Sequence, residues 1–141
     1  MRLRGSQKKA FKKRLLELVF EKRSSFIKHL ADEFGISRQM ASRHLSSLVK
    51  EGLVAREGKG RGTSYRLVET EHHYRGPAGG LDENRVWLRE IKPHLDRYEL
   101  PQNVMDICHY GATEMLNNIP EHAAAKKYLG RVSVNALTVT I

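Results

Sequence analysis

Two short amphipathic helices separated by a glycine turn are predicted between Ser25 and Glu51, and they constrain the fold more than any other feature of the chain. Apolar residues of the first helix recur at intervals of three or four and form one stripe that a core can cover. They are Ile27, Leu30, Ala31 and Phe34. Gly35 ends this helix, because glycine takes the left-handed conformation of a helix C-terminus at little cost. Ser37 then starts the second helix as an N-cap.

The second helix has an apolar side and a polar, positively charged side. Its inward residues are Ala41, Leu45, Leu48 and Val49. Its outward residues are Arg38, Gln39, Ser42, Arg43 and Ser46. A major groove admits one helix, and Arg and Gln side chains can hydrogen-bond to base edges there. The outward residues are therefore candidate DNA contacts, and the alternative is an ordinary solvated helix face.

A basic hairpin is predicted after the second helix. Residues 53–57 and 63–68 form its strands, and the loop 58–62 carries Lys59 and Arg61 between three glycines. Such a tip lets the backbone approach phosphates while the two cations neutralise them. With an earlier core helix through residues 11–19, this order of parts predicts a winged helix-turn-helix DNA-binding domain over residues 1–68.

The charge of the chain is concentrated in its first half. Residues 1–75 hold 18 Lys and Arg against 8 Asp and Glu, a net charge of +10, whereas residues 76–141 hold 7 against 8, a net charge of −1. A localised positive field of this kind is typical of a nucleic-acid partner. The asymmetry therefore supports double-stranded DNA as the partner, independently of the helix pattern.

Residues 7–68 resemble the winged-helix regulators of the arsenical-repressor and multiple-antibiotic-resistance kind. The resemblance is carried by the motifs ISRQMASRHLSSLVKEGLV and REGKGRGTSYRL. It implies groove contacts by Arg38, Gln39, Ser42 and Arg43, and wing contacts by Lys59 and Arg61 to the flanking backbone or minor groove. Because such regulators bind paired half-sites, it also implies a homodimer.

Residues 69–82 lack apolar periodicity and are predicted to be a flexible linker. The adjacent His72 and His73 have no third ligand at a suitable spacing, so no metal site is expected. A helix capped by Asp82 or Asn84 follows and is kinked or shortened by Pro93. The next helix opens near Pro101, and two strands, 131–135 and 137–141, end the sequence.

The helix after Pro101 is predicted to bury one apolar face. This face consists of Val104, Ile107, Cys108, Gly111 and Met115. Cys108 is therefore interpreted as a core residue and not as a nucleophile, and a single cysteine suits a reducing cytoplasm. No apolar run approaches the length of a membrane span, and no signal peptide is visible, so no membrane partner is expected.

The segment EMLNNIPEH at 114–122 places Glu114, Asn118 and His122 on one helical face. With VWLREIKPHL and LPQNVMDICHYGATEML upstream, it resembles the N-box region of the ATPase superfamily shared by gyrase, heat-shock chaperones, histidine kinases and mismatch-repair proteins. The resemblance implies that Asn118 holds the magnesium of a bound nucleotide and that Glu114 activates water or orients it, provided that the ATPase fold is complete. The alternative is a polar helix end with capping residues.

Pro120 interrupts this N-box pattern, and the Asp-x-Gly-x-Gly stretch and glycine-rich boxes of the superfamily do not follow. Residues 83–141 are therefore expected to be a truncated helix-helix-strand-strand piece of an ATPase α/β sandwich. The fold class expected for the whole chain is mainly α with small β, that is, α+β.

These features together predict a cytoplasmic, sequence-specific double-stranded DNA-binding transcription regulator. It is expected to have no catalytic residues, no metal and no cofactor, with Mg-ATP bound only in a longer form. The alternative is a fragment of a longer ATP-binding regulator in which nucleotide controls DNA binding through the linker. A third hypothesis is a structural adaptor whose winged helix binds protein.

Overall fold

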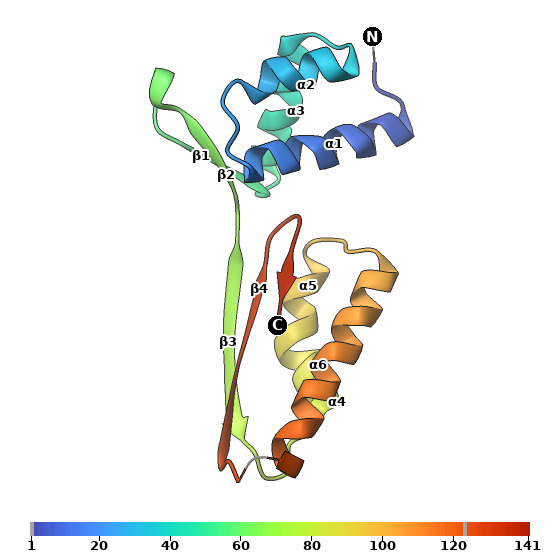
Figure 1. Cartoon of the computed structure of the whole chain (residues 1–141), viewed down its shortest axis with the longest axis vertical. Coiled ribbons are helices and arrows are strands. Elements are labelled where there is room, and N and C mark those ends of the chain that lie inside the picture. Colours follow the sequence, from blue (N-terminus) through green and yellow to red (C-terminus); the bar gives the residue numbers. More distant parts are fainter. Residues whose placement is uncertain (1, 123) are drawn as a thin grey trace. The chain divides into compact units, whose positions relative to one another are not determined.

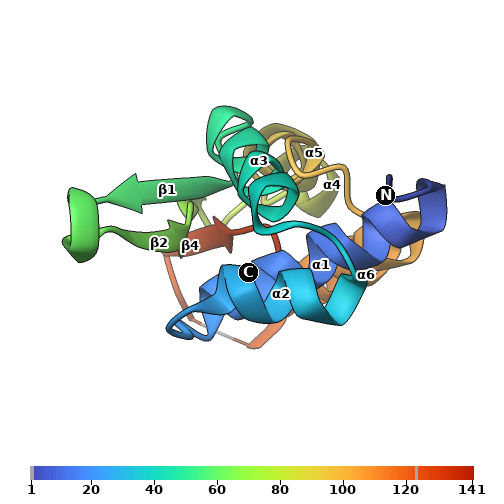
Figure 2. The same ribbon diagram turned by 90° about the horizontal axis from the view of Figure 1, so that it is seen from above.

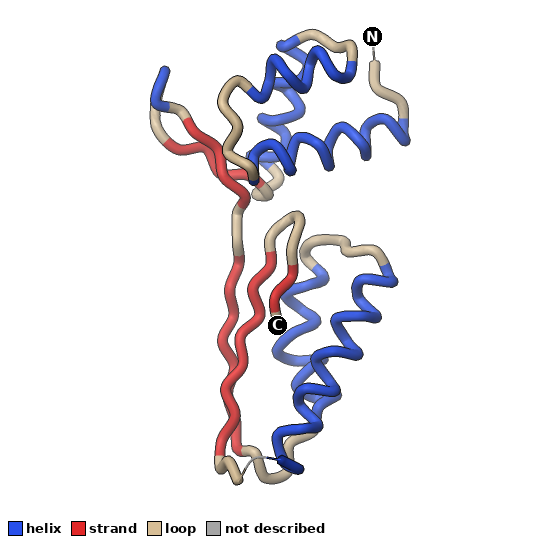
Figure 3. Tube along the Cα trace, viewed as in Figure 1, coloured by secondary structure: helices blue, strands red, loops and turns tan. Residues whose placement is uncertain are grey.

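The computed structural model describes residues 2–122 and 124–141 and divides the chain into two compact units. Unit 1 is Met1–Val68 and unit 2 is Glu69–Ile141. Helices dominate both units, and each contains one small antiparallel sheet (Figures 1 and 3). The predicted class, mainly α with small β, is therefore confirmed.

Unit 1 has the predicted order of three helices and a hairpin. In Figure 2 the hairpin extends away from the three helices. Its strands pair antiparallel from Val54 opposite Leu67 to Glu57 opposite Ser64. The elements are α1 (Gly5–Phe20), α2 (Phe26–Phe34), α3 (Arg38–Lys50), β1 (Val54–Glu57), the short 3₁₀ helix η1 (Gly60–Gly62) and β2 (Ser64–Leu67).

The core of unit 1 is centred on Phe11 of α1. Its ring meets the ring of Phe34 from α2 edge-on at a centroid distance of 5.1 Å, and it lies 4.8 Å from the His44 ring of α3. One aromatic side chain therefore joins all three helices, and fully burying such a side chain contributes about 1.5–3 kcal/mol. Aliphatic residues from every helix and from β1 complete the core, namely Leu15, Leu18, Val19, Leu30, Leu45, Leu48 and Val54.

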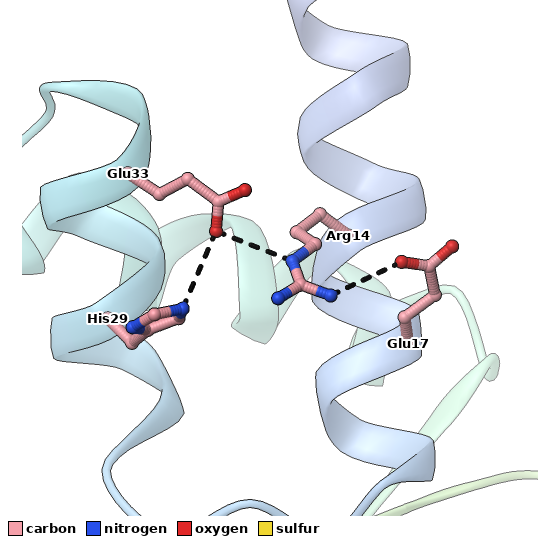
Figure 4. Close-up of polar contacts among 4 residues, drawn as sticks. All are labelled: Arg14, Glu17, His29 and Glu33. Atoms are coloured by element: carbon pink, nitrogen blue, oxygen red, sulfur yellow. Dashed lines mark hydrogen bonds and ion pairs between the residues drawn. The ribbon is translucent and has the colours of Figure 1, made fainter.

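Arg14 adds a polar link between α1 and α2 at the surface. Its guanidinium Nε lies 3.4 Å from Glu33 of α2, and its Nη1 lies 3.5 Å from Glu17 on its own helix (Figure 4). His29 approaches the same Glu33 oxygen at 3.7 Å. Because solvent reaches all four side chains, this link orients the two helices more than it stabilises them.

The turn between α2 and α3 has the predicted caps. Gly35 adopts φ 63° and ψ 35°, and its amide donates to the carbonyl of Ala31. Ile36 donates to the same carbonyl at 3.0 Å. Ser37 caps α3, since its hydroxyl accepts from the amide of Met40 at 3.1 Å.

Unit 2 is a three-stranded antiparallel sheet packed against helices. The strand order is β3-β4-β5. Its buried core consists of Tyr74, Val86, Trp87, Ile91, Leu95, Ala112, Leu116, Val132 and Val134. The elements are β3 (Thr70–Pro77), α4 (Glu83–Val86), the π turn η2 (Trp87–Ile91), α5 (Lys92–Asp96), α6 (Gln102–His122), β4 (Lys127–Val134) and β5 (Val139–Thr140).

The predicted linker at residues 69–82 is largely a strand. β3 pairs with β4 over its full length, from Thr70 opposite Val134 to Pro77 opposite Lys127. The half-buried or buried positions of β3 alternate with exposed ones, as a sheet with one covered face requires. Its inward residues are polar, aromatic or glycine, which is why the apolar periodicity expected of a strand is absent.

Two further expectations for unit 2 can be compared with the structure. Pro93 does not shorten the helix after Asp82, because α5 continues it; a π turn over Trp87–Ile91 instead distorts the helix just before the proline, where a kink was the other predicted effect. The buried face of α6 is also rotated from the predicted one: Ala112 and Leu116 are buried, whereas Ile107 is 69% exposed and Met115 is 51% exposed.

Two glycines of the β3–β4 ladder accommodate tyrosine rings. Tyr74 lies opposite Gly130, and Tyr128 lies opposite Gly76. A Cβ at Gly76 would come within 2.6 Å of the Tyr128 hydroxyl, and a Cβ at Gly130 would overlap the Tyr74 ring. The rings therefore occupy the space that a side chain would need.

No helix among residues 2–122 and 124–141 has both the length and the apolar character needed to cross a membrane.

We expect Gly35→Val to lower the free energy of unfolding of unit 1 by about 1–3 kcal/mol, because a β-branched residue is strained at positive φ. Gly35→Asn should cost less, since asparagine adopts the left-handed conformation more readily. Chemical denaturation of both variants measures the difference. Equal losses for Val and Asn would contradict this account.

We expect Gly130→Ala to destabilise unit 2 by about 1–3 kcal/mol, because the new methyl group would displace the buried Tyr74 ring. Gly79→Ala is the matched control, since a Cβ there meets no atom within 4 Å. Thermal denaturation of the two variants checks the prediction. A loss in the control as large as that in Gly130→Ala would show that the ring contact is not the cause.

Candidate functional site

The outer face of α3 presents all five of its predicted contact residues to solvent. Arg38, Gln39, Ser42, Arg43 and Ser46 are exposed, whereas Ala41, Leu45 and Leu48 are buried on the opposite side of the helix. The Ser37 cap and the apolar stripe together fix which residues face outward. The structure therefore brings these five side chains together on one surface.

The hairpin tip presents the other two predicted contacts. Lys59 and Arg61 are exposed at the turn between β1 and β2. Gly58 has φ 82°, and a Cβ there would collide with the backbone of Gly62. The tight turn therefore requires glycine, and it holds the two cations at the end of the hairpin. We refer to these seven residues of α3 and the hairpin tip as the basic face.

The cations of the basic face lack carboxylate partners within the described part of the chain. A few other cations of unit 1 do have such partners, for example Lys12 with Glu51 at 3.6 Å and Arg66 with Glu57 at 2.5 Å. In residues 2–122 and 124–141, no such ion pair involves Arg38, Arg43, Lys59 or Arg61. Their positive charge is therefore available to an external anion.

The N-terminal segment extends the basic face in a way that the sequence did not reveal. Arg2 and Lys8 line a hollow of about 310 Å³ together with Arg43 of α3. Leu3, only 7% exposed, anchors the segment. A buried leucine within a basic run is the one signal that could have indicated this arrangement.

The residues predicted to bind nucleotide lie on the surface of α6. Glu114 and Asn118 are both exposed and are one helical turn apart. The helix continues through position 120 to His122, so Pro120 does not end it, and the side chain of His122 lies outside the described residues. Within the described part of the chain, no group of three His, Cys, Asp or Glu residues is placed to hold a metal ion.

Unit 2 contains one cluster of titratable groups where β3 meets η2 and α5. His72 Nε2 lies 2.8 Å from Glu90 Oε2, and its ring stacks on His94 with centroids 4.2 Å apart. His73 lies on the opposite face of the sheet, 2.5 Å from Glu71. Burial, together with the neighbouring His72 and Arg97, lowers the pKa of His94, and Glu90 opposes the shift in part.

The Cys108 thiol is half-buried against the core of unit 2, as expected of a core residue. Burial raises its pKa, so the thiolate form is disfavoured.

Comparison with known protein families finds a similarity that covers unit 1. Residues 1–69 match the family described as protein adenylyltransferase SoFic-like, C-terminal domain. The chain is also 36% identical over 69 residues to uncharacterized protein MJ0558 of Methanocaldococcus jannaschii, an alignment that covers 49% of this chain and 22% of that protein. No solved structure matches the chain.

These findings correct four expectations. The match is to a domain of protein adenylyltransferases, so the assignment to arsenical-repressor and multiple-antibiotic-resistance regulators fused to a histidine-kinase-like ATPase is wrong. The same match contradicts DNA-binding transcription regulation as the function, and with it the description of the chain as a regulator joined to a truncated ATPase. It also contradicts the expectation that the protein is not an enzyme, because the matched domain is named as part of protein adenylyltransferases.

The assignment of DNA as the partner was not justified, because a basic helix face is not specific to one class of partner. Exposed Arg, Gln and Ser side chains suit any partner rich in hydrogen-bond acceptors and negative charge, so they do not by themselves identify the partner. The roles of the individual site residues are tested by neither the fold nor the comparisons, and their contact with double-stranded DNA stays a prediction.

We expect the stability of unit 2 to fall as the pH is lowered through about 6.5, the ordinary pKa of histidine. Because the folded state lowers the pKa of His94, the unfolded chain takes up the proton first, so stability is complete above this pH and is lost below it. Thermal denaturation across pH 5–8 measures the trend. His94→Gln should flatten it, and an unchanged slope in that variant would assign the pH dependence to another group.

Proposed function

We propose that this chain acts in protein adenylylation and that unit 1 is the part that engages the protein to be modified. The observation that carries the proposal is the family match over residues 1–69, which ends within one residue of the boundary of unit 1 at Val68. A domain that matches a family as one folded unit is a reasonable candidate for the same task. The chain spans 22% of the curated relative that it matches, so the activity of the whole enzyme belongs to the proposal.

The chemistry of the basic face supports a macromolecular partner with an acidic surface. Its cations are spread over α3, the hairpin tip and the N-terminal segment, and several of them have no carboxylate partner among the described residues. Complementary charge steers the association of macromolecules and fixes their orientation. The acidic protein to be modified is the occupant to which we commit.

In this proposal magnesium-ATP supplies the adenylyl group. The target hydroxyl forms a bond to the α-phosphorus of ATP, pyrophosphate leaves, and the hydroxyl proton passes to a base or to water. The cytoplasm is the compartment proposed, since ATP is supplied there and a lone cysteine suits a reducing environment.

We expect the full chain, incubated with magnesium and ATP labelled at the α-phosphate, to transfer label covalently to acidic proteins in a mixture of purified acidic and basic proteins. ATP labelled at the γ-phosphate should leave no label, because the pyrophosphate departs. Denaturing electrophoresis and autoradiography make the measurement. Absence of α-label from every protein would overturn the proposal of adenylylation.

A pair of charge-reversal variants tests the role of the basic face. Arg38→Glu combined with Arg43→Glu should reduce labelling by about tenfold or more, because like charges then oppose the acidic target. Arg89→Glu combined with Lys127→Glu makes the same charge change on exposed positions of unit 2 and should leave labelling unchanged. Equal labelling of acidic and basic proteins, or equal losses in the two double variants, would overturn the docking role.

A binding measurement separates the protein partner from a nucleic acid. If duplex DNA binds the basic face with steep salt dependence and acidic proteins do not bind, DNA is the occupant and the acidic-protein partner is wrong.

A further inference from the structure

The outer strand β3 has an unpaired edge that is long and regular. Figure 1 shows β3 at the outside of the sheet of unit 2, and its only sheet neighbour among the described residues is β4. The β3–β4 register runs through eight consecutive pairs without a bulge. Natural edge strands are usually shortened, bulged or protected by charged side chains or proline, whereas β3 is long, has Pro77 only at its far end and carries charges of both signs. An edge of this kind is a template for another strand.

The hydrogen-bonding pattern identifies which residues face the free edge. The amide of Ala78 donates to the carbonyl of Lys126 at 3.0 Å, one step beyond the pair Pro77–Lys127. Because hydrogen-bonded and non-hydrogen-bonded pairs alternate along an antiparallel ladder, the backbone groups of Glu71, His73 and Arg75 are directed away from β4. Pro77 belongs to the same set, and its missing N–H therefore faces the free edge and not the ladder.

The charged residues along this edge can pair with the same residues of a second β3 strand. If two β3 strands pair antiparallel about a two-fold axis at His73, Glu71 of each strand lies opposite Arg75 of the other. His72 then lies opposite Tyr74 of the other strand, and Thr70 opposite Gly76. Opposite charges and aromatic side chains facing each other are favourable cross-strand pairs.

We propose that β3 pairs with β3 of a second copy of this chain, centred on His73, to form a continuous six-stranded sheet. The two strands exchange six backbone hydrogen bonds through residues 71, 73 and 75, because each of the three symmetric pairs contributes two. A two-fold interface must be self-complementary, and the Glu71–Arg75 spacing about His73 meets that requirement. The proposal stands on β3 alone and is independent of adenylylation.

Charge reversal and its restoration test the register. Sedimentation velocity of the full chain at about 100 µM should give twice the single-chain mass of 16.2 kDa. Glu71→Arg alone, or Arg75→Glu alone, places like charges opposite each other at two points and should weaken dimerisation by about tenfold or more. The double variant restores both pairs and should return the dissociation constant to within about threefold of the original.

Two controls keep the test specific. Lys127→Glu makes the same charge change as Arg75→Glu on β4 and should leave the dimer unchanged. His73→Pro removes the N–H at the axis, which the β3–β4 ladder does not use, so it should abolish the dimer while circular dichroism shows a folded chain. A monomeric wild-type chain, or a dimer that survives both Arg75→Glu and His73→Pro, would overturn the proposal.

Discussion

The pairing of β3 with β4 is the interaction on which unit 2 depends. It joins a strand that directly follows unit 1 to one that lies beyond α6, and it positions every helix between them against one face of the sheet. The two tyrosine–glycine pairs make this ladder specific, since Tyr74 and Tyr128 each need a partner without a side chain. A shift of the register by one residue would turn the inward side chains of one of the two strands to the outer face and would place each tyrosine opposite a residue with a side chain.

Unit 1, in contrast, is held together by contacts between elements that are close in the sequence. Phe11 joins the three helices, and the caps at Gly35 and Ser37 fix the angle at which α3 leaves the turn. Because the apolar side of α3 is buried, Arg38 and Arg43 on its other side are exposed to solvent. In the function proposed above, this surface would hold a target protein, a task that requires fixed charges but no deep pocket.

The contrast between the units explains what could be predicted from sequence. In unit 1 the second and third helices and both hairpin strands lie within one residue of their predicted bounds, because helix periodicity, caps and turn residues are local signals. The first helix was predicted only through residues 11–19, and α1 begins six residues earlier, at Gly5. In unit 2 the strand β3 was missed, since its inward residues, such as His72 and Gly76, become strand residues only through pairing with a segment more than 50 residues away. The buried face of α6 was misplaced because apolar residues such as Ile107 and Met115 occur around much of the helix.

For the candidate site, too, local features could be predicted from the sequence and non-local features could not. Exposure of the α3 residues and of the hairpin cations could be predicted from helix phase and turn composition. The approach of Arg2 and Lys8 to Arg43 could not, because it depends on where the N-terminal segment packs. The identity of the partner could not be predicted either, since cations and amides recognise nucleic acids and acidic proteins by the same forces.

Side-chain hydrogen bonds gather at the end of the β3–β4 ladder that adjoins unit 1. The Ser133 hydroxyl donates to the carboxylate of Glu69, and the Thr70 hydroxyl lies 3.1 Å from that of Tyr98. At the opposite end no side-chain hydrogen bond forms among the described residues, and the ladder closes with the backbone bond from Ala78 to Lys126. Opening of a strand pair starts where it is least secured, so amide hydrogen exchange in this ladder should proceed inward from Pro77 while the end joined to unit 1 stays closed.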